Sequence, residues 1–189
     1  MKTIELYFDY ASPWAYLAEM LVPRLFGGLT VVRRPTYLRA FDAFAKGVPY
    51  SVPKLQYLMR DFLRCAAHEG IPFRPPTQFP INGVHALRGA LIAEREGCLD
   101  AYHRAMFRAA WQDDRDVSNA DVVADVARES CGAKVQDALS DPWAKGELRA
   151  RGEAAIARGL FGVPTFVVGD ELFWGHDRMA YAMRAATAE

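Results

Sequence analysis

The chain has 189 residues, of which 51% are apolar and 24% are charged. This composition is typical of one folded domain, with or without a large insertion, and excludes disordered, collagen-like and disulfide-stapled chains. The 23 basic and 23 acidic residues leave a formal net charge of zero, so no overall positive charge attracts nucleic acid.

The N-terminal segment predicts a β-strand rather than a targeting leader. Lys2, Glu5 and Asp9 interrupt its apolar character, and no later apolar run approaches the ~20 residues of a membrane span. We therefore expect a cytoplasmic protein with no membrane or nucleic-acid partner. Residues 3–8 are β-branched and aromatic, which favours a strand.

A βαβ unit is predicted from the first forty residues. Ser12 followed by Pro13 is typical of a helix N-cap and first turn, and apolar residues at helical spacing continue to Gly27 and Gly28. Residues 29–34 read as a second strand. The crossover between the two strands is expected to be right-handed.

The middle of the chain predicts only helices. One apolar face runs from Leu55 to Ala66 and stops at Gly70. Further helices are indicated near residues 84–91 and 102–110, after the capping pattern Ser118-x-x-Asp121, and from Pro142 to about residue 159. Strands return at residues 165–168 and 172–174, and a last helix is predicted over about 177–186.

This order of elements, βαβ…ββα, predicts an α/β fold with a thioredoxin-like core and a large all-helical insertion. Residues 1–38 and 159–189 would form the thioredoxin-like domain and residues 39–158 the helical domain. The last helix before residue 159 could pack on the core sheet. The same elements also permit a helical protein with a small accessory sheet.

The cysteines favour structural thiols. Cys65, Cys98 and Cys131 are odd in number, form no C-x-x-C pair, and lie 33 residues apart without any surrounding repeat. No metal site is predicted. We expect three buried or half-buried thiols with packing roles.

Ser12 is the first candidate for chemistry. In a thioredoxin-like fold the residue that caps the first helix faces the active site, and redox members place a cysteine there. The tetrapeptide Ser12-Pro13-Trp14-Ala15 has no thiol, which excludes disulfide exchange at this position. A hydroxyl at a helix N-terminus can donate a hydrogen bond to a bound anion such as a thiolate. Alternatively, Ser12 only caps its helix.

Two further segments could bind a peptide-like ligand. Val163 precedes Pro164 at the start of a strand, where we predict a cis peptide bond and backbone pairing of Val163 with an extended ligand. An ordinary proline at a strand start is the alternative. In the segment 174–178, Asp177 and Arg178 could hold an ammonium and a carboxylate, or could be a helix cap and a surface residue. His176 could carry a proton.

These segments together resemble a known family. The pattern comprises F-D-Y-x-S-P-W-x-Y-L at residues 8–17, K-x-x-Y-x-x-x-D-x-x-R at 54–64, F-P-x-N at 79–82, Arg88, G-x-F-G-V-P-T-F at 159–166 and F-W-G-x-D-R at 173–178. It resembles 2-hydroxychromene-2-carboxylate isomerases and kappa-class glutathione transferases of the DsbA-like branch of the thioredoxin superfamily.

The resemblance implies a glutathione cofactor and a homodimer. Ser12 would hold the sulfur as the catalytic residue and Val163 would pair with the tripeptide backbone. The γ-glutamyl end would be bound by Trp174, Gly175, His176, Asp177 and Arg178.

The implied reaction converts 2-hydroxychromene-2-carboxylate to trans-o-hydroxybenzylidenepyruvate by reversible addition of the glutathione thiolate. The alternatives are a kappa-like transferase and a non-catalytic binder of thiol peptides. Many relatives read G-N-x-P where this chain has Gly47-Val48, so one polar contact to the ligand or substrate is in doubt. The polar candidates for an anionic aromatic keto-acid substrate are Lys46, Lys54, Asn82 and Arg88.

Overall fold

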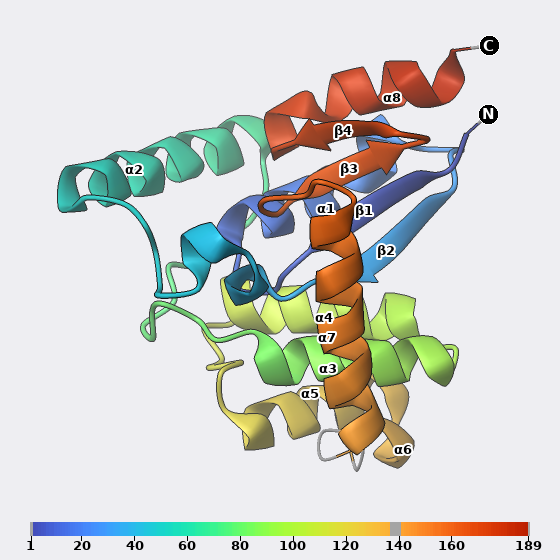
Figure 1. Ribbon diagram of the computed structural model, residues 1–189. Helices are drawn as coiled ribbons and strands as arrows, with labels where there is room; N and C mark the ends of the chain where they lie inside the picture. Colours follow the sequence, from blue (N-terminus) through green and yellow to red (C-terminus); the bar gives the residue numbers. More distant parts are fainter. Residues whose placement is uncertain (1, 137–140, 189) are drawn as a thin grey trace.

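The computed structural model describes residues 2–136 and 141–188 (Figure 1). Its sheet contains β1 (Ile4–Phe8), β2 (Val31–Pro35), β3 (Thr165–Val168) and β4 (Glu171–Trp174), in the order β2-β1-β3-β4. β1 pairs with β2 in parallel, whereas β3 is antiparallel to both β1 and β4. The predicted α/β class with a thioredoxin-like sheet is confirmed. The predicted ends of the first domain at residues 1 and 189 lie outside the described residues.

Alternation along β1 assigns one set of side chains to each face of the sheet. Ile4, Leu6 and Phe8 are fully buried in the main core, which also receives side chains of α1 (Pro13–Leu25) and α8 (Met179–Thr187). Tyr7 points to the other face and packs in a smaller cluster with Ala155 of α7 (Pro142–Ala157). Helices therefore cover both faces of the sheet.

The helical segments share the main core with the sheet. They are α2 (Val52–Glu69), α3 (Val84–Arg95), α4 (Leu99–Trp111), α5 (Ala120–Cys131) and α6 (Ala133–Gln136), preceded by the short 3-10 turns η1 (Leu38–Ala40) and η2 (Asp42–Phe44). In Figure 1, α3 to α6 form a layer below the sheet, while α2 projects to one side. Buried residues of β1, α1, α3 and α4 belong to one continuous hydrophobic cluster. The division at residues 39 and 158 stays a prediction.

Two of the predicted helix starts are wrong. The cap of α5 is Asn119, whose side chain accepts the Asp121 N–H at 2.8 Å, while the Ser118 hydroxyl instead accepts the Asn82 N–H at 2.9 Å. The last helix begins at Met179, because residues His176–Arg178 form the 3-10 turn η4. The predicted start of α7 is confirmed: the Asp141 side chain accepts the Trp143 N–H at 2.8 Å.

The prediction of three structural thiols is wrong for Cys98 and Cys131. Cys98, before α4, and Cys131, at the end of α5, form a disulfide with their Cα atoms 6.0 Å apart. The packing of α4 against α5 brings together two cysteines that are 33 residues apart in the sequence. Cys65 on α2 is a free, half-buried thiol.

The described residues contain neither a membrane-spanning helix nor a group arranged to hold a metal ion. Within residues 2–136 and 141–188, no helix combines the length and apolar character needed to cross a bilayer. In the same ranges, no group of three or more His, Cys, Asp or Glu side chains is arranged to hold a metal ion.

The close packing of α3 on α4 gives a stability prediction. A Cβ at Gly89 would overlap the Tyr102 hydroxyl, which is buried and donates to the Ala86 carbonyl at 2.8 Å. We expect Gly89→Ala to lower the free energy of unfolding by about 2 kcal/mol, through overpacking and loss of this hydrogen bond. Urea denaturation measures the change.

Gly146 on α7 is the matched control, since a Cβ there meets nothing within 4 Å. Gly146→Ala should stabilise the protein by about 0.5–1 kcal/mol through helix propensity alone. Equal effects of the two substitutions would contradict the packing described for Gly89.

Candidate functional site

Ser12 lies where β1 turns into α1. Its Oγ accepts the N–H of Ala15 at 3.2 Å, and its own N–H donates to the Asp9 carbonyl at 3.0 Å. Pro13 is the first residue of the helix, and the Ser12 residue is 5% exposed. A hydroxyl that accepts one hydrogen bond still has its own proton to donate. Ser12 can therefore cap the helix and also donate to an anion at this end of α1.

The segment before β3 offers an unpartnered peptide backbone. The Val163–Pro164 peptide bond is cis, as the sequence predicts. Thr165 Oγ1 donates to the Gly162 carbonyl at 2.7 Å, and the Pro164 carbonyl accepts the Gly175 N–H at 2.9 Å. Among the described residues, neither the N–H nor the carbonyl of Val163 has a hydrogen-bond partner. Both groups are thus available to an extended ligand.

The segment 174–178 contacts both α1 and the loop before β3. Gly175 has φ of +100°, and a Cβ there would lie 2.6 Å from the Asp177 carboxylate, so this position requires glycine. The His176 ring stacks on Trp14 of α1, with ring centroids 4.8 Å apart. Burial lowers the pKa of His176, against the opposing effect of nearby acidic groups that include Asp177. The stack brings the N-terminal turn of α1 next to η4.

Asp177 and Arg178 pair with each other at the surface. The carboxylate and guanidinium are 3.1 Å apart, and both side chains are more than half exposed. Asp177 caps neither η4 nor α8, so the helix-cap interpretation of this residue is wrong. An exposed pair of this kind contributes little to stability, so it can exchange its partners for a charged ligand at small cost. Trp174 is 48% exposed and packs on Phe161, with ring centroids 5.2 Å apart.

Comparison with known proteins connects this geometry to a family. The model of the DSBA-like thioredoxin domain matches residues 3–185. A 2-hydroxychromene-2-carboxylate isomerase of Sphingobium xenophagum is 31% identical over 189 residues, which cover 95% of each chain. One of Pseudomonas putida is 30% identical over 185 residues, covering 93% of this chain and 90% of the relative. A solved 2-hydroxychromene-2-carboxylate isomerase structure matches with a TM-score of 0.81 and 30% identity, covering 97% and 93% of the two chains.

The chain belongs to the 2-hydroxychromene-2-carboxylate isomerase family. The resemblance noted in the motifs is confirmed, and so is the prediction that the chain is an enzyme of this isomerase type. The match extends over nearly the whole chain, helical middle included.

Asp9 lies beside Ser12 at the candidate site, although the sequence did not single it out. One carboxylate oxygen accepts the Ala11 N–H at 2.9 Å and the other accepts the Leu38 N–H at 2.7 Å. Gly83 lies directly against the same carboxylate, where a Cβ would overlap it. The side chain is fully buried, and burial raises its pKa from the ordinary 3.8 to about 6, opposed by the two N–H donors and Arg39. The sequence signal that could have identified Asp9 is its place in the F-D-Y-x-S-P-W motif.

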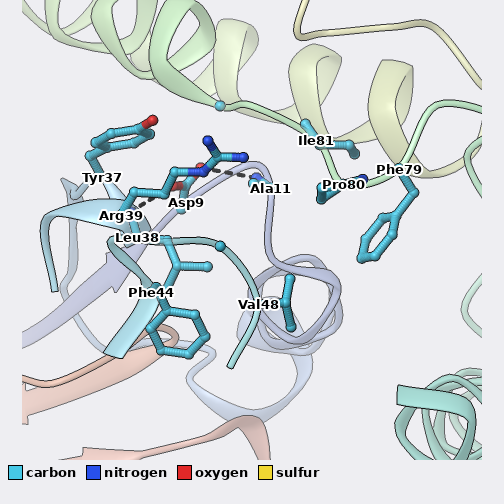
Figure 2. A pocket seen from close by; sticks show the side chains of 12 residues that line it. Asp9, Ala11, Tyr37, Leu38, Arg39, Phe44, Val48, Phe79, Pro80 and Ile81 are labelled. Carbon is cyan, nitrogen blue, oxygen red and sulfur yellow. Dashed lines mark hydrogen bonds between the residues drawn. The ribbon is translucent and has the colours of Figure 1, made fainter. Parts of the chain in front are cut away.

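A cavity of about 50 Å³ that opens to solvent lies beside this carboxylate (Figure 2). Its wall is mostly apolar and comes from segments far apart in the sequence. The lining residues are Asp9, Ala11, Tyr37, Leu38, Arg39, Phe44, Gly47, Val48, Phe79, Pro80, Ile81 and Gly83. Val48 of the Gly47-Val48 segment is therefore at the cavity.

None of the four polar residues considered for the substrate belongs to the lining of the cavity. Lys46 is exposed next to Gly47, and the Lys54 ammonium lies 4.4 Å from the centre of the Tyr50 ring. Asn82 accepts a hydrogen bond of 3.1 Å from the Tyr37 hydroxyl. On α3, the buried Nε of Arg88 has no hydrogen-bond partner among the residues that the structure describes.

The buried Asp9 carboxyl gives a pH prediction. The folded protein holds this proton more tightly than the unfolded chain, so the stability it contributes is fully present below the unfolded pKa of 3.8 and is lost as the pH rises through about 6. We expect the free energy of unfolding of the wild type to fall by about 3 kcal/mol relative to Asp9→Asn between pH 3.5 and 7.5.

Urea denaturation of both proteins at the two pH values measures this difference. Comparing the variants cancels the other titrating groups, such as Glu5 and Glu19, whose pKa values are lowered. A difference that does not change with pH would contradict a raised pKa for Asp9.

Proposed function

We propose that this protein is a glutathione-dependent isomerase of 2-hydroxychromene-2-carboxylate and related aromatic keto acids. The observation that carries the proposal is the Ser12 hydroxyl at the N-terminus of α1, in a tetrapeptide without a thiol. The match to isomerases over more than 90% of the chain supports the reaction type. Disulfide exchange at this position would need a cysteine that the tetrapeptide does not have.

The residues present fit glutathione. Ser12 keeps a proton to donate to the sulfur, Val163 has an unpartnered N–H and carbonyl for the tripeptide backbone, and Asp177 and Arg178 form an exposed pair that suits an α-amino acid head group. The Trp14–His176 stack and the Pro164–Gly175 hydrogen bond hold these elements near one another.

In the proposed mechanism, the protein stabilises and positions a thiolate. Bound glutathione would supply a sulfur nucleophile that adds reversibly to the conjugated substrate, so that a rigid double bond becomes free to rotate before the sulfur leaves again. Ser12 donates its hydroxyl proton as a hydrogen bond to the sulfur, and the N-terminus of α1 favours the negative charge. Val163 fixes the tripeptide backbone, which limits the positions that the sulfur can occupy.

Replacing Ser12 tests its proposed role. Ser12→Ala should reduce isomerase turnover by about a hundredfold or more, since one hydrogen bond to an anion in a buried site is worth roughly 3 kcal/mol. The loss of the cap should cost only about 1 kcal/mol of stability. Steady-state kinetics and urea denaturation separate the two effects.

Ser51 provides the control, because it caps α2 without a side-chain hydrogen bond. Ser51→Ala should retain full turnover.

Product analysis of the wild type distinguishes the three activities: recovered glutathione with rearranged substrate supports the isomerase, consumed glutathione indicates a transferase, and binding without turnover indicates a thiol-peptide binder. Undiminished turnover in Ser12→Ala would refute the role of the hydroxyl.

Asp177 and Arg178 should determine affinity rather than turnover. Asp177→Asn and Arg178→Ala each leave one charge of the γ-glutamyl group without a partner, so we expect about thirtyfold weaker glutathione binding, or roughly 2 kcal/mol. Turnover at saturating glutathione should change less, because the sulfur lies at the other end of the tripeptide. Calorimetric titration with glutathione measures the affinities.

The control is Asp125→Asn, which removes half of another exposed pair, on α5, whose partner Arg128 is 2.9 Å away. This variant should bind glutathione as the wild type does. Wild-type affinity in both η4 variants would show that the Asp177–Arg178 pair is only a surface ion pair.

A further inference from the structure

The cavity beside Asp9 has the walls of a small-molecule site. Its enclosed space is only about 50 Å³, but it opens to solvent, and its lining is mostly apolar with a few polar groups, as is common for ligand pockets. Ala11, which lines it, directly precedes Ser12. A ligand in the cavity would therefore lie against the turn that delivers the Ser12 hydroxyl.

Apolar side chains stand exposed at this cavity. Phe79 is 47% exposed and Val48 is 39% exposed. Each can therefore bury more of its surface against a ligand. Phe44 and Ile81 add further apolar wall. Covering such surface favours binding, and an aromatic ring buries a large apolar area on contact.

Arg39 is the one cation among the described lining residues. Its side chain is exposed and forms no ion pair with any acid in the part of the chain that the structure describes. In Figure 2 it extends toward Asp9. The Asp9 oxygens, however, are engaged by the N–H groups of Ala11 and Leu38. No hydrogen bond or ion pair among the described residues occupies the guanidinium, so its fork is available to a ligand, and its geometry matches a carboxylate.

We propose that Arg39 selects the substrate by binding its carboxylate while Phe79 and Val48 cover its aromatic ring. The cavity thus takes a flat aromatic carboxylate. The inference deepens the proposed function, on which it rests for the reaction itself, and it assigns the specificity for a carboxylate to Arg39.

The charge at Arg39 explains why a neutral ring would be a poor competitor. An apolar wall alone distinguishes weakly between an acid and its amide, because both present the same ring to Phe79 and Val48. A guanidinium–carboxylate pair at the edge of a partly closed cavity adds a charge-assisted contact that only the acid can make. The valine at position 48 adds apolar wall where an asparagine would add a competing polar group.

The test measures binding of 2-naphthoate and of its neutral analogue 2-naphthamide, by calorimetry without glutathione. We expect saturable 2-naphthoate binding to the wild type and at least tenfold weaker binding to Arg39→Gln. The 2-naphthamide affinity should be the same in both proteins. Phe79→Ala should weaken both ligands, because it removes part of the wall that covers the ring.

The matched control is Arg104→Gln, which removes an exposed arginine on α4 that does not line the cavity. It should bind 2-naphthoate as the wild type does. Equal 2-naphthoate affinity in wild type and Arg39→Gln, no saturable binding to the wild type, or a loss in Lys46→Gln in place of Arg39→Gln would each overturn the proposal.

The outcome is independent of the thiolate chemistry. The binding measurements are made without glutathione, so no thiolate takes part in them. A protein that binds 2-naphthoate through Arg39 and does not turn over with glutathione would refute the proposed function alone. A glutathione-dependent isomerase in which Arg39→Gln leaves the 2-naphthoate affinity unchanged would refute this inference alone.

Discussion

The geometry of the site depends on one buried carboxylate. Asp9 accepts hydrogen bonds from the N–H groups of Ala11 and Leu38, and Gly83 lies directly against it. Three segments that are distant in the sequence are therefore fixed to the same group. The Asp9 carbonyl also accepts the Ser12 N–H, so the turn that presents the hydroxyl and the wall of the cavity share one anchor. An ionised carboxylate without these donors would be costly to bury.

Local signals were enough to predict the frame of the molecule. Ser12-Pro13 and Asp141-Pro142 each mark a helix start, because a capping side chain and a proline act on their own neighbours. The features that were missed depend on tertiary contacts. Asn119 caps α5 because the Ser118 hydroxyl is taken by a distant N–H group, and Cys98 meets Cys131 only because α4 packs on α5.

The candidate site was likewise predictable only where its signals are local. The motifs identified Ser12, Val163 and the segment 174–178, and the structure connects these elements through the Trp14–His176 stack and the Pro164–Gly175 hydrogen bond. Neither contact follows from spacing in the sequence. The cavity is a further step away from local signals, since its lining combines four or more separate segments. Arg39 carried no motif of its own, and its place beside Asp9 appears only once the chain is folded.

The proposed function requires Ser12 and the N-terminus of α1 to stabilise the thiolate of bound glutathione. The most direct test is a pH titration of the ultraviolet absorbance of that thiolate, in the wild type and in Ser12→Ala. We expect the pKa of the bound thiol to be lower than that of free glutathione by about one unit or more in the wild type, and to move back toward the free value in Ser12→Ala. A bound thiol with the same pKa as free glutathione, or an identical pKa in the two proteins, would refute thiolate stabilisation by Ser12.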